Sequence, residues 1–157
     1  MQVIAHRGNL TGPNPERENK LDYIAEALAE GVDVEVDVWF HEGKLYLGHD
    51  KPDTPISVGF LLDNRFWCHA KNIEALDVML DHNVHCFFHD VDEVTLTSKG
   101  FVWTFPGKKL TKRSVCVLPE TTTGFYGQKF SAICTDYTRF YKFADFPNVS
   151  NLPVPTA

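Results

Sequence analysis

Short apolar runs that favour β-structure recur along the chain, and polar turn residues separate them. Eight runs are candidate strands, at residues 3–8, 32–40, 44–50, 65–72, 84–90, 101–107, 114–120 and 131–137. Most of them end in polar or ionisable residues, as in the segments HRG, HAKN, FHD, LPE and TDY. Parallel sheets place their functional groups at the carboxyl ends of the strands, so this recurrence predicts one polar edge.

Helical spacing of apolar residues separates several of these runs. The first predicted helix has four apolar residues on one face, Leu21, Ile24, Ala25 and Leu28. Gly31 stands where the stop of this helix is expected. A second helix is predicted over 73–82 and a shorter one over 91–99. The alternation of strand and helix predicts an α/β fold with a largely parallel sheet.

One connection cannot be a parallel crossover. The segment HEGK, before Leu45, is so short that residues 44–50 must return as the second arm of a hairpin. A full (β/α) barrel takes about 250 residues, far more than this chain has. We therefore predict a trimmed TIM-type barrel with about seven to eight strands and reduced outer helices. It would form one domain over 1–145, followed by a proline-rich tail over 146–157.

Composition narrows the classes of partner. The chain of 157 residues is 43% hydrophobic and carries a formal charge of −6, so nothing in it favours nucleic acid. The sequence shows neither a secretory signal nor an apolar run near the roughly 18 residues of a membrane span. We expect a cytoplasmic protein without stable membrane insertion. The cysteines are expected to be buried, reduced thiols: Cys68, Cys86, Cys116 and Cys134.

The segment VDVEVDV places Asp33, Glu35 and Asp37 on one face of a strand and valines on the other. A half-exposed strand gives the same alternation, but a central parallel strand is normally apolar on both faces. Acidic groups buried there would have to be paired or bound to a cation. Glu35 and Asp37 point the same way and could share one hard cation.

Histidines follow two of the predicted strands. His6 in AHRG and His49 in LGHD could face each other across one pocket and carry out general acid–base chemistry. Taken singly, each fits a hydrogen-bonded structural histidine as well. The segment FWCHAKN adds His69, either a metal ligand or a core histidine, and Lys71, which could pair with the carboxylates or hold an anion.

Several of these motifs occur together in one known family. The segments IAHRG and ENKLDYIAEALAEGVDVEVDVWFHEGKLYLGHD resemble the glycerophosphodiester phosphodiesterases, within the phosphatidylinositol-phospholipase-C-like superfamily. The similar elements are His-Arg-Gly after the first strand, Glu18–Asn19 before the first helix, a Glu-x-Asp strand and a His-Asp hairpin end. The proline that usually precedes the Glu-Asn pair is Arg17 here. The resemblance is dense through residues 3–50 and then recurs in short islands such as FVWTF and AICTDYT.

This resemblance implies metal-dependent hydrolysis of a phosphodiester, such as a glycerophosphodiester. His6 and His49 would form the acid–base pair, and Arg7 would contact the phosphate. Lys71 would offset phosphate charge together with Arg7. The alternatives are phospholipase-C-like cleavage through a cyclic phosphate and a degenerate module that binds a phosphorylated ligand without turnover. The expected partner is a small-molecule phosphodiester, and strands exposed by an incomplete barrel make a homodimer plausible.

The resemblance also implies a divalent cation held by Glu35 and Asp37, with Glu18 supporting the ligands. Where the family has Glu-x-Lys, this chain reads His69-Ala70-Lys71, so imidazole replaces the third carboxylate. Mg²⁺ or Ca²⁺ is the expected ion, and Mn²⁺ becomes an option because of His69. Alternatively His69 is not a ligand, and the two carboxylates and water hold the metal.

Overall fold

The computed structural model describes residues 1–122, 125 and 127–142. Ten strands lie in this part: β1 (Gln2–His6), β2 (Asp33–His41), β3 (Lys44–Leu47), β4 (Thr54–Ile56), β5 (Phe66–Ala70), β6 (Cys86–Phe87), β7 (Val94–Leu96), β8 (Val102–Thr104), β9 (Ser114–Val117) and β10 (Ala132–Thr135). The helices are α1 (Leu21–Ala29), α2 (Ile73–Asp81) and α3 (Thr138–Lys142), with 3-10 turns η1 (Val58–Leu62) and η2 (Pro119–Thr121). The predicted tail over 146–157 lies outside the described residues.

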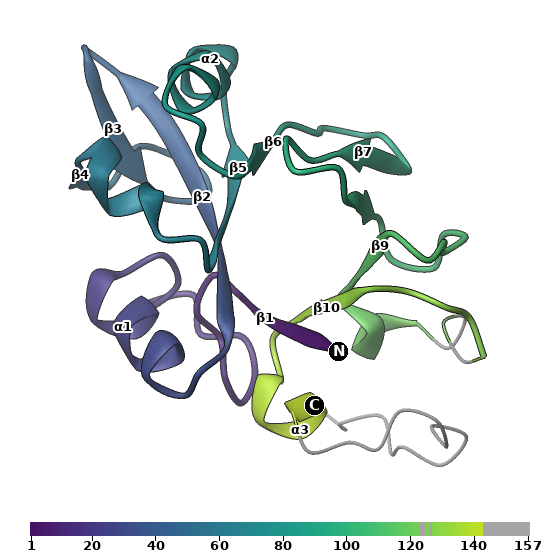
Figure 1. Ribbon diagram of the computed structural model, residues 1–157. Helices are drawn as coiled ribbons and strands as arrows, with labels where there is room; N and C mark the ends of the chain where they lie inside the picture. Colours follow the sequence, from purple (N-terminus) through teal and green to yellow (C-terminus); the bar gives the residue numbers. More distant parts are fainter. Residues whose placement is uncertain (123–124, 126, 143–157) are drawn as a thin grey trace.

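All ten strands belong to one mixed sheet, in which β8, β9, β10, β1, β2, β5 and β6 follow one another as parallel neighbours. Strands β3 and β4 continue antiparallel from β2, and β7 pairs antiparallel with β8. The sheet curves into a half-barrel, and the three short helices lie outside the curve (Figure 1). Within the described part, their contacts are with β1, β2, β5 and β6.

The predicted trimmed TIM-type barrel is therefore wrong. The sheet is mixed rather than parallel, has ten strands and carries only three short helices in the described part. The predicted helix over 91–99 contains β7 instead, where Val94 and Thr95 suit a strand because β-branched side chains lose freedom in a helix. No helix lies between β6 and β7 or between β8 and β9, and the described residues between β9 and β10 contain only the 3-10 turn η2. The hairpin of β2 and β3 and the first two helices are confirmed.

Strand β2 explains how the sheet separates apolar from charged side chains. Its valines, Val34, Val36 and Val38, are buried outside the curve with residues of α1 and α2 such as Ile24 and Met79. A second apolar cluster, which includes Ile4, Trp67, Phe87, Trp103 and Val115, fills the inside of the curve. The acidic side chains of β2 face inward beside this second cluster. The four cysteines are free and buried, as predicted.

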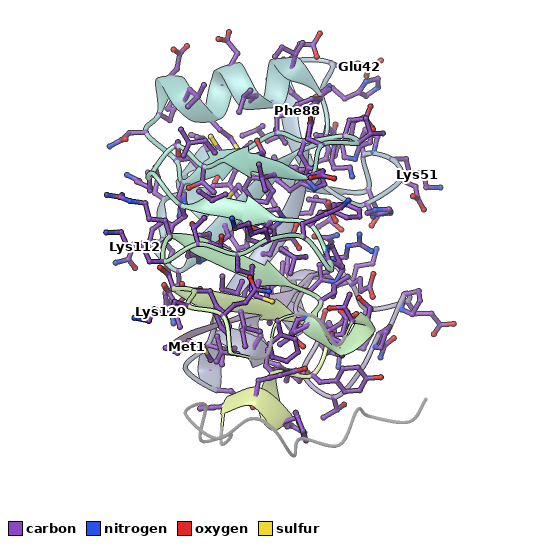
Figure 2. The ribbon with its side chains drawn as sticks, turned by 90° about the vertical axis from the view of Figure 1, so that its right-hand side faces the viewer. Met1, Glu42, Lys51, Phe88, Lys112 and Lys129 are labelled. Atoms are coloured by element: carbon purple, nitrogen blue, oxygen red, sulfur yellow. The ribbon has the colours of Figure 1, made fainter. Side chains whose placement is uncertain are left out.

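The amino ends of the parallel strands lie on one side of the molecule and their carboxyl ends on the opposite side. Met1, Lys112 and Lys129 come shortly before β1, β9 and β10, and they lie along one side in Figure 2. Lys51, from the loop after β3, lies on the opposite side. The carboxyl ends of β1, β2 and β5 face that opposite side, where the candidate site forms. No helix in the described part is long and apolar enough to cross a membrane.

Candidate functional site

The register of three neighbouring strands brings the predicted metal ligands together. His6 of β1 lies beside Glu35 of β2, and Asp37 of β2 lies beside His69 of β5. The two carboxylates share the inward face and are almost fully buried, with 2% and 0% exposure. Ligand atoms of Glu35, Asp37 and His69 all lie within 4.8 Å of one another.

A tight turn after β1 folds Arg7 back over the ends of the strands. Arg7 adopts a left-handed backbone with φ of 53°, and its amide donates to the carbonyl of Glu35 at 3.0 Å and to Glu35 Oε2 at 3.2 Å. Its guanidinium then lies between two carboxylates. Nε is 3.0 Å from Asp37 Oδ2, and Nη1 donates to Glu18 Oε2 at 3.1 Å. Glu18 therefore positions Arg7, and its predicted support of the metal ligands stays a prediction.

Asp37 is the most heavily paired group of the site. Asn19 donates to its Oδ2 at 2.9 Å and accepts from its amide at 3.0 Å. His69 Nδ1 lies 3.1 Å and Lys71 Nζ 3.5 Å from Asp37 Oδ1. Burial alone would raise the pKa of Asp37, but the His69 hydrogen bond and the charges of Arg7 and Lys71 hold it well below its usual range. Asp37 is therefore ionised at neutral pH.

The site as a whole carries more negative than positive charge. Burial, together with the charge of Asp37, raises the pKa of Glu35. Among the described residues of the cluster, carboxylates on Glu18, Glu35, Asp37 and Asp136 face fixed cations on Arg7 and Lys71. A divalent cation beside Glu35 and Asp37 would offset this excess. Two carboxylates and an imidazole are a donor set that fits Mn²⁺ as well as Mg²⁺ or Ca²⁺.

His6 is held by a carboxylate from the last strand. Its Nδ1 lies 2.7 Å from Asp136 Oδ1, just after β10, and Asn9 Nδ2 donates to the same oxygen at 2.8 Å. Glu120 Oε1 accepts from the amide of Asp136 at 2.9 Å and so fixes this turn. Burial lowers the pKa of His6, but the hydrogen bond to Asp136 and the charge of Glu35 outweigh it, so the pKa is raised overall.

His49 reaches the site from the turn that follows β3. The amide of Gly48 donates to the carbonyl of Asp37 at 3.1 Å, and Trp39 Nε1 donates to the carbonyl of Gly48 at 2.7 Å. A Cβ on Gly48 would lie 2.2 Å from the carbonyl oxygen of Lys51, so only glycine fits this turn. His49 Nδ1 bonds to Asp50 Oδ1 at 2.7 Å, and the side chain is 43% exposed.

Two cavities meet at His6, Arg7 and His49, which line both. One, of about 460 Å³, is mainly polar and extends over the loops that carry Glu18 and Lys51. The other, of about 340 Å³, has a charged half and an apolar half. Its charged half is formed with Glu35, His69, Lys71, His89 and Asp90; its apolar half consists of Trp103, Phe105, Pro106, Val117 and Leu118.

The structure thus brings all eight predicted site residues to one place. Sequence reasoning did not assign roles to Asp136, Asn9, Asn19, Trp103 or Phe105. Asp136 had a signal, because the segment TDY ends a predicted strand as HRG does. Asn19 had one too, because the Glu18–Asn19 pair is part of the motif, whereas Asn9 gave none, since asparagine is common in any turn.

Comparison with protein-family models, with curated proteins and with solved structures gave no match to this chain. The resemblance to glycerophosphodiester phosphodiesterases therefore depends on the motif residues themselves and on how they are arranged.

Proposed function

We propose that this chain is a metal-dependent phosphodiesterase that hydrolyses a small phosphodiester, such as a glycerophosphodiester. The observation that carries the proposal is the buried cluster of Glu35, Asp37 and His69 beside a histidine that a carboxylate orients. Burying this many carboxylates is costly unless a cation compensates them. Such a cluster is therefore better explained by a ligand than by folding alone.

Glu35 and Asp37 would hold the divalent cation, with His69 as a third ligand. When bound, the cation would offset negative charge on the phosphate oxygens and lower the pKa of bound water. Arg7 and Lys71 line the same cavity and add positive charge where it builds up in the transition state. Glu18 and Asp37 keep the guanidinium of Arg7 in place.

The two histidines move the protons. Asp136 accepts from Nδ1 of His6, so Nε2 of His6 is left as the basic nitrogen and can take a proton from the attacking hydroxyl. The nearby carboxylates then stabilise the resulting imidazolium, as the raised pKa of His6 indicates. His49, across the shared cavities, would supply the proton to the leaving alkoxide. The attacking hydroxyl belongs either to water or to the substrate itself.

A direct assay tests this proposal. The purified protein is incubated with bis(p-nitrophenyl) phosphate and with a glycerophosphodiester, each with and without Mg²⁺, Mn²⁺ or Ca²⁺. We expect metal-dependent turnover that His6→Ala and His49→Ala each abolish. His41→Ala is the matched control, because His41 is an exposed histidine of the same hairpin, and it should retain full activity. Absence of metal-dependent turnover with both substrates would refute the enzyme. ³¹P NMR of the products shows whether a cyclic phosphate forms first.

One observation favours a second function, binding of a phosphorylated ligand without turnover. Both ring nitrogens of His69 have protein partners, with Nδ1 3.1 Å from Asp37 Oδ1 and Nε2 3.3 Å from the carbonyl oxygen of His89. A His69 held in this way would be a structural residue, and the cation would lack its third protein ligand. Calorimetric titration with the glycerophosphodiester distinguishes the two functions, because a binding module would bind it and leave it uncleaved.

A further inference from the structure

The apolar half of the 340 Å³ cavity is not explained by hydrolysis of a phosphodiester as such. A glycerophosphodiester with two hydrophilic alcohols needs charge near the phosphate but no apolar surface. Here, however, five lining residues are apolar and come from the neighbouring strands β8 and β9 and the residues just after them: Trp103, Phe105, Pro106, Val117 and Leu118. Phe105 borders this cavity and is 45% exposed, so a large aromatic side chain faces solvent there.

The backbone holds part of this apolar wall in a strained conformation. Leu118 has φ of 44° and ψ of 55°, the left-handed region that a bulky residue rarely adopts. Such strain persists where the surrounding structure imposes it, and it is concentrated at binding sites. The amide of Leu118 donates to the carbonyl of Cys134 at 2.7 Å, and the turn that it begins carries Glu120, which fixes Asp136. The apolar wall and the catalytic histidine therefore share one support.

Aromatic side chains continue from the wall to the metal cluster. Phe105 packs edge-on against His89, with ring centroids 5.9 Å apart and planes at 75°. His89 in turn stacks on His69, with centroids 4.7 Å apart and planes at 12°. A flat group that rests on Phe105 and His89 would therefore lie close to a phosphate bound at Arg7 and Lys71.

The two cavities also differ in the polarity of their linings, as a phosphodiester with two unlike alcohol groups would require. Because both are lined by His6, Arg7 and His49, a phosphate at these residues would border both cavities and could place one alcohol group in each. The other cavity is lined mainly by charged and polar side chains, among them Glu18, Lys20 and Lys51. Burial of apolar surface would then fix which alcohol enters which cavity.

We propose that the site selects phosphodiesters with unlike alcohols: one with an apolar, ring-bearing group that packs against Trp103, Phe105 and Leu118, and one hydrophilic. This inference rests on the proposed phosphodiesterase function and names its class of substrate. The hydrophilic alcohol, of glycerol type, occupies the cavity beside Lys20 and Lys51. The preference is set by the wall residues and not by the metal ligands.

The test compares benzyl glyceryl phosphate with methyl glyceryl phosphate. Both varied groups are primary alcohols of similar basicity, so a difference in kcat/KM reports binding of the ring rather than reactivity. We expect the benzyl ester to be favoured by at least about tenfold, as contacts in apolar pockets typically give. Phe105→Ala should bring the ratio of the two kcat/KM values close to one. Phe88→Ala is the matched control, because Phe88 is a similarly exposed aromatic residue outside this cavity, and it should leave the ratio unchanged.

Calorimetric titration of His6→Ala with the same two esters separates the two proposals. If the wild-type protein cleaves both esters with equal kcat/KM, the proposed phosphodiesterase activity is supported and the proposed selectivity is overturned. If the wild-type protein cleaves neither ester but the benzyl ester binds more tightly to His6→Ala, the proposed phosphodiesterase activity is refuted. The proposed binding of a ring at the apolar wall is then still supported. Equal binding without cleavage would overturn both.

Discussion

The two ends of the half-barrel contain similar residues in opposite electrostatic states. At the amino ends of the strands, Asp33 of β2 accepts from Trp67 Nε1 at 2.8 Å, beside His85, whose ring centroid lies 4.3 Å from that of Trp67. Trp67 and His85 line a cavity of about 270 Å³ with Gln2 and Phe101. Burial raises the pKa of Asp33 and lowers the pKa of His85 to about 4. Both groups are thus shifted toward their neutral forms.

At the carboxyl ends an aspartate and a histidine are shifted toward their charged forms, although burial shifts Glu35 and His89 there toward their neutral forms. Asp37, four residues along the same strand, has its pKa lowered, and His6 has its pKa raised. Asp33 and His85 have neutral hydrogen-bond partners in Trp67 and Thr97, whereas Asp37 and His6 have charged ones. The comparison shows that charged partners outweigh the effect of burial on the pKa values of Asp37 and His6, whereas the neutral partners of Asp33 and His85 do not.

The largest effect is expected from Asp136→Asn. The amide oxygen can still accept from Nδ1 of His6 and from Asn9 Nδ2, but the negative charge that stabilises the protonated ring of His6 is lost. We expect kcat for the glycerophosphodiester to fall about 1000-fold, within the range that a positioned acid–base group contributes. At the other end, Thr97→Val removes the partner of His85 at 3.0 Å and should leave kcat unchanged. Equal losses in both variants would mean that His6 is not the base.

Asp37→Asn should be the most destabilising change at this site. It leaves Arg7 and Lys71 without their buried partner, which should lower the free energy of unfolding by about 3 kcal/mol. Asp33→Asn keeps an acceptor for Trp67 Nε1 and should cost about 1 kcal/mol or less. Urea unfolding followed by tryptophan fluorescence measures both. If Asp33→Asn proved the more costly, the electrostatic contrast between the two ends would be wrong.

Gly48→Ala tests how His49 is positioned. The new Cβ would collide with the carbonyl of Lys51, and the resulting shift of the turn should reduce kcat/KM about 100-fold. Gly43→Ala in the same hairpin also has a positive φ, of 76°, but its Cβ meets nothing within 4 Å. This control should cost about 1 kcal/mol of stability and leave kcat/KM intact. Similar activities for the two variants would count against a role for His49.

The smallest effect expected is a pH dependence at the amino ends. In the unfolded chain His85 takes up a proton near its ordinary pKa of 6.5, whereas in the folded chain it does so only near pH 4. The stability that neutral His85 provides is therefore complete above pH 6.5 and is lost as the pH falls from 6.5 to 4. Because solvent screens this partly exposed ring, we expect the loss to be only about 1 kcal/mol. His85→Gln should flatten this part of the curve of unfolding free energy against pH, whereas exposed His82→Gln should not. A curve unchanged by His85→Gln would show that His85 titrates normally.

The sequence predicted the long, regular elements of the fold better than the short ones. Dense, regular patterns such as VDVEVDV and the helix before Gly31 fix β2 and α1, because period and length leave few alternatives. Strands β4 and β7 have only three residues each, too few for a pattern, so they were missed. The half-barrel itself follows from short connections that carry no helix, and the absence of a helix is hard to infer from weak apolar periodicity.

The candidate site, too, could be predicted only in part from the sequence. Residues on ordered strands, such as Glu35 and Asp37, were placed correctly because register follows from alternation. Asp136 lies 130 residues from His6, so no local pattern could pair them. The apolar wall was missed because it is formed by residues at the ends of β8 and β9, each of which looks like ordinary core by itself.

The left-handed backbone at Leu118 has a consequence for how this molecule could evolve. Asparagine accepts that conformation more readily than leucine does, so Leu118→Asn would relax the turn while removing an apolar side chain from the cavity. Thermal robustness and ligand discrimination would then change in opposite directions. Selection for heat resistance alone would therefore favour such replacements and would yield a protein with higher thermal stability but lower ligand selectivity.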